Sequence, residues 1–170
     1  MTPEFSRPIR LEELSSRERT YDIEARDDER VALAKRFALQ SIGRLSASVA
    51  LKTEAAGRLV RLKARFEAEV VQTCVVTLDP APARIVGEFE VLYDRTLGPQ
   101  GREVMIDSGG VDVVPLEGEA LDIGEAVAEE LSLSLDPYPR APGAAVEAET
   151  AAPDGGHRPF EMLARLKAKH

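Results

Sequence analysis

The sequence predicts an α+β domain built on an antiparallel sheet. Its 170 residues, of which 44% are hydrophobic and 31% charged, suffice for one core and are too few to suggest two. Apolar residues alternate with polar ones through much of residues 42–74, whereas residues 28–40 and 122–133 have apolar residues at helical spacing. We therefore expect residues 1–140 to form a single domain in which two helices pack on a sheet that can close into a barrel.

Two short strands and a helix are expected first. The strands are predicted at residues 5–9 and 20–25, and the helix at residues 28–40. Asp27 is a good N-cap for this helix, and acidic residues follow it in the first turn, where they suit the helix dipole. Its core-facing side is predicted to carry Val31, Ala34, Phe37 and Ala38.

Three long strands come next and predict an antiparallel meander. They are expected near residues 42–52, 61–74 and 84–93, where side chains alternate between apolar and polar or charged. A turn is expected at residues 53–57. The two prolines of residues 79–82 are expected to break the second of these strands before the third begins, because proline cannot donate to a strand ladder.

The C-terminal half predicts a second helix. Short strands are expected at residues 103–106 and 111–115, followed by a helix over residues 122–133. Asp122 can cap this helix, and Glu125, three residues later, can reach back as in a capping box. Two prolines, at positions 137 and 139, end it.

The end of the chain is expected to lie outside the domain. Residues 141–157 are rich in alanine, glycine, proline and glutamate, which predicts a disordered linker. Residues 158–170 predict a tethered helix, which presents Phe160, Leu163 and Leu166 on one face. These three residues are candidate contacts either with the chain's own domain or with a partner.

Several classes of protein are disfavoured by what the sequence lacks. No apolar run approaches the roughly 18 residues of a membrane span, and the first residues do not resemble a secretion signal. We therefore expect a cytoplasmic protein without a membrane partner. The two histidines, His157 and His170, are poorly placed for nucleophilic catalysis, and no phosphate-binding glycine loop is recognisable. We expect the protein not to be an enzyme.

Metal binding is also disfavoured. Cys74 is the only cysteine, so it cannot build a thiolate metal site, and alternation along its strand predicts that it is buried as a small apolar residue. Five acidic residues offer oxygen ligands, but their spacing matches no calcium loop and favours a solvated acidic face. These are Asp107, Asp112, Glu117, Glu119 and Asp122. We expect no metal and no cofactor.

Charge is divided unevenly along the chain, although the net charge is −8. Residues 31–65 contain eight basic residues and one acidic residue, whereas residues 66–130 contain three basic and fifteen acidic residues. The basic strands could contact RNA phosphates, but no aromatic residue is interleaved for base stacking. The candidates are Arg44, Lys52, Arg58, Arg61, Lys63 and Arg65. A solvated sheet face, or pairing of the two segments across the sheet, would explain the same residues.

Three blocks of the sequence together resemble a known family. They are residues 72–80 (QTCVVTLDP), residues 121–125 (LDIGE) with residues 129–140 (EELSLSLDPYPR), and residues 158–167 (RPFEMLARLK). In this order and spacing they resemble the YceD family, bacterial proteins associated with accumulation of large-subunit ribosomal RNA, with relatives in plant organelles. The resemblance covers most of the chain from about residue 40 onward.

The resemblance also shows where this chain departs from its relatives. The family pattern usually has a second cysteine three residues after the first, where this chain has Thr77, and often further cysteines where it has residues 137–140. The resemblance therefore implies a metal-free branch to which no ligand role carries over.

The family's function implies a non-enzymatic factor that supports accumulation of 23S ribosomal RNA or ribosome assembly. The implied partner is ribosomal RNA or a basic ribosomal protein, with no catalytic residues to transfer. The alternative is a protein-interaction adaptor whose acidic surface binds a basic partner without RNA contact. A deep pocket on which Asp112, Glu117 or Tyr93 converge would instead indicate an enzyme.

Overall fold

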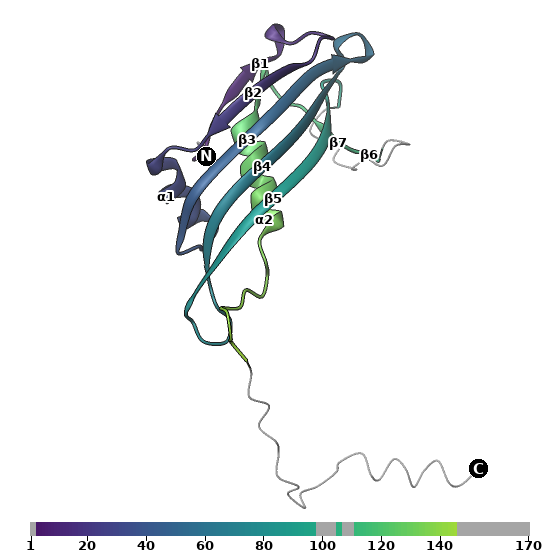
Figure 1. The fold of residues 1–170 in the computed structure, drawn as a ribbon. Coiled ribbons are helices and arrows are strands. Elements are labelled where there is room, and N and C mark those ends of the chain that lie inside the picture. Colours follow the sequence, from purple (N-terminus) through teal and green to yellow (C-terminus); the bar gives the residue numbers. More distant parts are fainter. Residues whose placement is uncertain (1–2, 98–104, 107–110, 146–170) are drawn as a thin grey trace, which may run out of the picture.

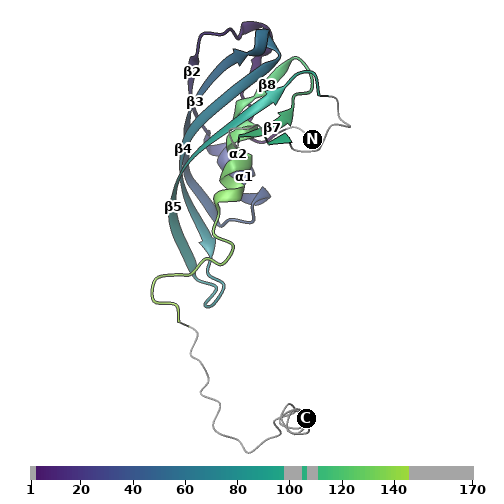
Figure 2. The ribbon, with the colours of Figure 1, turned by 90° about the vertical axis from the view of Figure 1, so that its right-hand side faces the viewer.

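A curved sheet with helices on one side makes up the body of the protein (Figures 1 and 2). The computed structural model describes residues 3–97, 105–106 and 111–145. Its strands are β1 (Pro8–Arg10), β2 (Arg19–Glu24), β3 (Ser41–Glu54), β4 (Leu59–Thr73), β5 (Pro80–Asp94), β6 (Met105–Ile106), β7 (Asp112–Pro115) and β8 (Ala120–Asp122). The helices are α1 (Asp27–Arg36) and α2 (Ile123–Ser134), with single 3-10 turns η1 (Leu11–Glu13) and η2 (Ala55–Gly57).

The strand order of the main sheet is β2-β3-β4-β5-β7-β6, and β1 pairs with β8 in a separate two-stranded sheet. Strands β2 to β5 form the predicted antiparallel meander, whereas β7 runs parallel to β5. The sheet is open, so the expected barrel is wrong. Strand β6 has only two residues, too few to pair along β2 and close the sheet.

The core lies between the sheet and α2, as the alternating pattern predicts. The inward residues of β3 and β4 are almost all buried, and Phe66 is the largest of them. The helix contributes Ile123, Val127 and Leu131, each fully buried. Such burial is the main source of stability for a domain of this size.

Helix α1 is shorter than predicted and faces the core differently. It ends at Arg36, because Ala38 adopts a left-handed φ of 54° that a helix cannot continue through. Position 26, not Asp27, precedes the first turn, and its N–H donates to Glu29 at 2.8 Å. Leu33 is buried, whereas the predicted core residue Val31 is 72% exposed.

The prolines of residues 79–82 lie within a strand, rather than between two strands as expected. Strand β5 begins at Pro80 and pairs with β4 along its whole length, whereas β7 pairs only with Val91 to Asp94. The first part of β5 is therefore an edge. Proline is tolerated there because its missing N–H leaves no neighbouring strand unpaired.

The beginning of the chain is fastened to the start of α2. Asp122 caps the helix as predicted, with its Oδ1 accepting from the N–H groups of Gly124 at 3.0 Å and Glu125 at 3.1 Å. The same carboxylate accepts from the Ser6 hydroxyl at 2.5 Å and from the Arg7 N–H at 2.7 Å. The Glu125 side chain binds Arg36 of α1 rather than completing a capping box.

The predictions for the end of the chain are only partly covered. Residues 141–145 include a turn in which the Ala144 N–H donates to Ala141. The rest of the expected linker, residues 146–157, and the expected helix at 158–170 lie outside the described residues. In the part of the chain that the structure describes, neither helix is long and apolar enough to cross a membrane.

Candidate functional site

The outer face of the sheet, opposite the helices, carries most of the basic residues proposed to contact RNA. Arg44 and Lys52 lie on β3, and Arg61, Lys63 and Arg65 lie at successive outward positions of β4. Lys52 is directly opposite Arg61, whereas Arg44 lies toward the other end of the strand, opposite Glu69. Arg58 belongs to the connection between these strands. The structure therefore distributes the six residues along the face.

Each of these six cations pairs with a carboxylate. Three partners lie on the neighbouring strand β5, which the sequence places in the acidic half of the chain. Their nitrogen–oxygen separations are Arg44–Glu24 3.6 Å, Lys52–Glu54 2.9 Å, Arg58–Asp94 3.5 Å, Arg61–Glu54 2.8 Å, Lys63–Glu90 3.3 Å and Arg65–Glu88 3.2 Å, and Arg61 also pairs with Glu90. Pairing of the basic and acidic segments across the sheet, one of the predicted alternatives, is confirmed for Arg58, Lys63 and Arg65, whereas Arg44 and Lys52 pair with glutamates outside the acidic segment.

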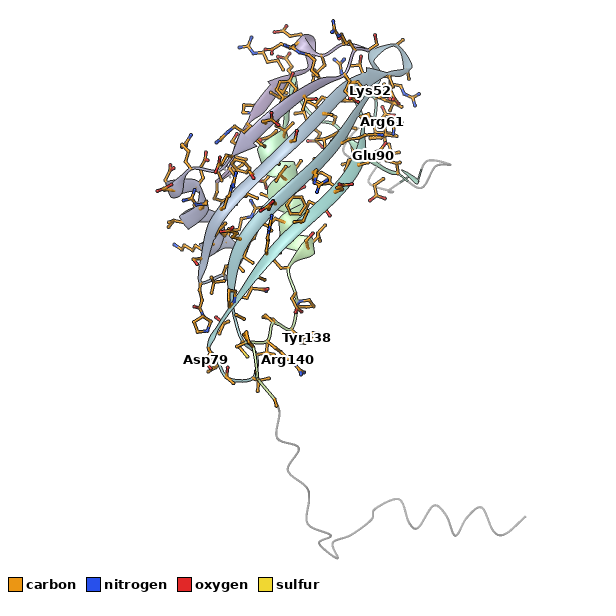
Figure 3. All side chains as sticks on the ribbon, viewed as in Figure 1. Lys52, Arg61, Asp79, Glu90, Tyr138 and Arg140 are labelled. Atoms are coloured by element: carbon orange, nitrogen blue, oxygen red, sulfur yellow. The ribbon has the colours of Figure 1, made fainter. Side chains whose placement is uncertain are left out.

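The tightest pairing surrounds Arg61, which is only 19% exposed (Figure 3). Its guanidinium donates two hydrogen bonds to Glu54, at 2.8 and 2.9 Å, and also binds Glu90. Hydrogen bonds from Arg61 and then Lys52 lower the pKa of Glu54 to about 2. Hydrogen bonds and opposite charges both hold Arg61, Glu54, Glu90 and Lys52 together, so these four residues form a stabilising cluster.

Replacement of Glu54 by glutamine is expected to cost about 1 kcal/mol of unfolding free energy at pH 7, the upper range for an exposed pair. Because folding depresses the pKa of Glu54, its contribution is present above pH 4.5 and is lost as pH falls toward 2. Urea unfolding at several pH values should show the wild-type advantage disappearing over this window. Glu88→Gln, in a pair 69% exposed, is the control and should change stability less. Equal effects of the two variants would contradict the assignment.

A groove follows β3 along the outer face, over the small residues Ser46 and Ser48. It comprises two adjoining depressions of about 410 and 650 Å³ that share Ser48 and Arg65. The charged residues lining it are five acids and three bases: Asp22, Glu24, Glu67, Glu88, Glu90, Arg44, Lys63 and Arg65. An excess of carboxylates suits a positively charged polypeptide better than a phosphate backbone.

The loop that follows β4 buries the only cysteine, as predicted. Cys74 is fully buried, and its sulfur accepts from the N–H groups of Val76 and Thr77 at 3.4 Å each. Hydrogen bonds from the Ala141 backbone and from Thr77 lower the pKa of Cys74 to about 6. Among the residues that the structure describes, no three potential metal ligands gather at one place.

The described members of the acidic set considered for metal binding are not gathered in one metal site. Asp112 and Glu117 are exposed, and Asp122 is engaged in capping α2. Tyr93, the third residue of the pocket that would indicate an enzyme, lies on β5, where burial and then Glu129 raise its pKa to about 12. Asp107 lies outside the described residues.

Sequence reasoning missed the residues that neutralise the basic strands. Glu54, Glu88 and Glu90 are visible in the sequence as members of alternating strands, but their partners depend on strand register. It also missed Leu78, which is 75% exposed and has a φ of 64°. A leucine before Asp-Pro gives no signal of a left-handed backbone.

Comparison with known proteins places this chain in a family. The family described as "Large ribosomal RNA subunit accumulation protein YceD" matches residues 62–167, which is more than half of the chain. The chain belongs to the YceD family. The match includes most of β4, the Cys74 loop, α2 and the last block of the resemblance, so the predicted family is confirmed. No curated protein and no solved structure matches the chain.

Membership of the YceD family associates the chain with accumulation of large-subunit ribosomal RNA. The matched residues include the Cys74 loop, which packs against the segment after α2. The Val75 N–H donates to the Pro139 carbonyl at 2.9 Å, and the Gln72 amide donates to the Asp136 carbonyl at 2.8 Å. In this YceD protein, therefore, hydrogen bonds join the Cys74 loop to the segment that follows α2.

Proposed function

We propose that this YceD protein is a non-enzymatic, cytoplasmic factor that supports accumulation of 23S ribosomal RNA by binding a basic ribosomal protein. The observation that carries the proposal is the pairing of all six candidate RNA-binding cations with carboxylates. Because each of these cations is paired, they leave no free basic surface on the outer face. The chain's net charge of −8 therefore makes the protein acidic on this face as well. Such a surface attracts basic proteins and repels phosphate.

The groove over Ser46 and Ser48 supports binding of an extended basic segment. Asp22 and Glu24 lie two residues apart on β2 and face the same side, so they are separated by about 7 Å along the strand. Alternate side chains of an extended peptide have the same spacing. Lysine or arginine residues at positions i and i+2 of a bound tail would therefore meet these two carboxylates.

Direct RNA contact is the second candidate, and side-chain exposure favours it. Arg65 is 70% exposed, and Arg44, Arg58 and Lys63 are each more than half exposed. Exposed ion pairs contribute less than about 1 kcal/mol, so these cations could exchange a carboxylate for a phosphate. Arg61 is not suited to this exchange, because two glutamates hold it.

Binding to purified large-subunit precursor particles and to the mixed proteins extracted from them distinguishes these candidates. Asp22→Asn combined with Glu24→Gln is expected to weaken binding to the extracted proteins about tenfold, since both removed charges face the proposed basic tail. Lys63→Glu combined with Arg65→Glu is the matched control and should not weaken it. Nuclease treatment should leave wild-type binding intact.

The opposite pattern would support RNA contact. In that case nuclease abolishes binding, the Lys63→Glu and Arg65→Glu variant loses it, and affinity for the particles falls steeply with added salt. The protein-mediated proposal would be rejected if Lys63→Glu with Arg65→Glu abolished binding to the particles while Asp22→Asn with Glu24→Gln left binding unchanged.

A further inference from the structure

Three exposed apolar side chains gather at the end of the molecule where the described chain finishes. Val75 is 50% exposed, Leu78 is 75% exposed and Tyr138 is 73% exposed; we call these three residues the apolar end. The Val75–Pro139 hydrogen bond brings the loop against the segment that contains Tyr138. In Figure 3 Tyr138 lies with Asp79 and Arg140 at this end, far from the Arg61 cluster.

The loop that presents Leu78 is fixed in shape. The Cys74 N–H donates to the Asp79 carbonyl at 2.8 Å, and the Leu78 N–H donates to the Cys74 carbonyl at 3.0 Å. Leu78 has a φ of 64°, a conformation that costs an L-residue roughly 1–2 kcal/mol. A strained backbone that holds a leucine in solvent favours a contact surface over a simple turn.

The charged residues around the apolar end indicate which kind of segment could bind there. Asp79 and Asp136 are exposed beside it, and neither forms an ion pair with another described residue. Arg140 is the one nearby cation on these two segments. A covering segment would therefore need apolar side chains and an excess of positive charge.

Residues 158–167 of the same chain have this chemistry. They contain Phe160, Leu163 and Leu166 at three-residue spacing, with Arg158, Arg165 and Lys167 against the single acid Glu161. The described chain ends at Ala145, six residues after Pro139, whose carbonyl accepts from the Val75 N–H. Residues 146–157, which we call the tether, separate this segment from Ala145 by 12 residues. A flexible chain of that length spans roughly 20 Å.

We propose that residues 158–167 bind the apolar end of their own chain, with Phe160, Leu163 and Leu166 covering Val75, Leu78 and Tyr138. The tether starts beside this surface, so the local concentration of the segment there is about millimolar, enough for a small apolar contact to form. The positive charges of the segment then face Asp79 and Asp136. This inference does not depend on the proposed ribosomal role.

A tryptophan reporter in the full chain tests the proposal, because the protein has no tryptophan of its own. In Phe160→Trp, the emission should be blue-shifted and shielded from acrylamide. Adding Leu78→Asn should shift the emission to the red and raise the quenching constant about threefold. Asparagine tolerates a positive φ better than leucine, so this variant preserves the loop. Tyr138→Ser should act in the same way.

Val31→Asn is the matched control, because Val31 is equally exposed but lies on α1. It should leave the emission unchanged. A solvent-exposed tryptophan in Phe160→Trp would overturn the proposal, as would shielding that Leu78→Asn and Tyr138→Ser do not affect. Shielding that grows with protein concentration would also overturn it, because the segment would then bind a second copy.

Discussion

Gly124→Ala is expected to lower the free energy of unfolding by about 3 kcal/mol, the upper range for overpacking a buried position. A Cβ at this position would lie far inside van der Waals contact of the Phe5 carbonyl oxygen and 3.1 Å from the Arg7 nitrogen. Both atoms belong to the backbone, so no side-chain rotation can relieve the clash. The N-terminal segment would have to move.

Movement of that segment would break several contacts at once. Ser6 and Arg7 donate to Asp122, the Ile123 N–H donates to the Arg7 carbonyl at 3.2 Å, and Phe5 is fully buried. We therefore expect the midpoint of urea unfolding, followed by circular dichroism, to fall markedly.

Gly43→Ala is the control for this substitution. An added Cβ at Gly43 would meet only Glu69 atoms at 3.6–3.8 Å, which is ordinary contact. Its stability should stay within about 0.5 kcal/mol of wild type. If Gly124→Ala were as stable as Gly43→Ala, the close packing of the N-terminal segment on α2 would be wrong.

The parts of the fold that the sequence predicts well are those with a strong local signal. Alternation identifies β3 and β4 over most of their length, and Asp122 identifies the start of α2. Elements that depend on distant contacts are less visible. Strand β8 has three residues and exists because β1 pairs with it, and β5 extends back through Pro80 because one of its sides is free.

The candidate site required information that periodicity does not contain. The sequence shows that Arg61, Lys63 and Arg65 share a face, and this is correct. Whether they are free depends on which β5 residues lie opposite them. The register aligns Lys63 with Glu90 and Arg65 with Glu88, and a one-residue shift would have placed apolar side chains there instead. Family membership, by contrast, is recognisable from the sequence alone, because each block that carries the resemblance is a continuous run of residues.

Phe66→Ala is expected to have the largest effect on stability, about 4 kcal/mol, because it removes a fully buried aromatic ring from the centre of the sheet. The ring lies opposite Gly87 on β5 and packs edge-on against Phe89, with centroids 6.3 Å apart. A Cβ at Gly87 would lie 2.7 Å from the Phe66 Cζ. The absence of a side chain at Gly87 therefore makes room for the ring.

This arrangement predicts strong coupling between the two positions. Gly87→Ala alone should cost about 2 kcal/mol, because the buried ring cannot move away without opening the core. In the double variant with Phe66→Ala the added methyl group meets no ring, so the loss should remain near 4 kcal/mol rather than reach about 6. Denaturant unfolding of the four proteins measures the coupling. Additive losses would mean that the ring leaves room for a methyl group, and Gly87 would then need another explanation.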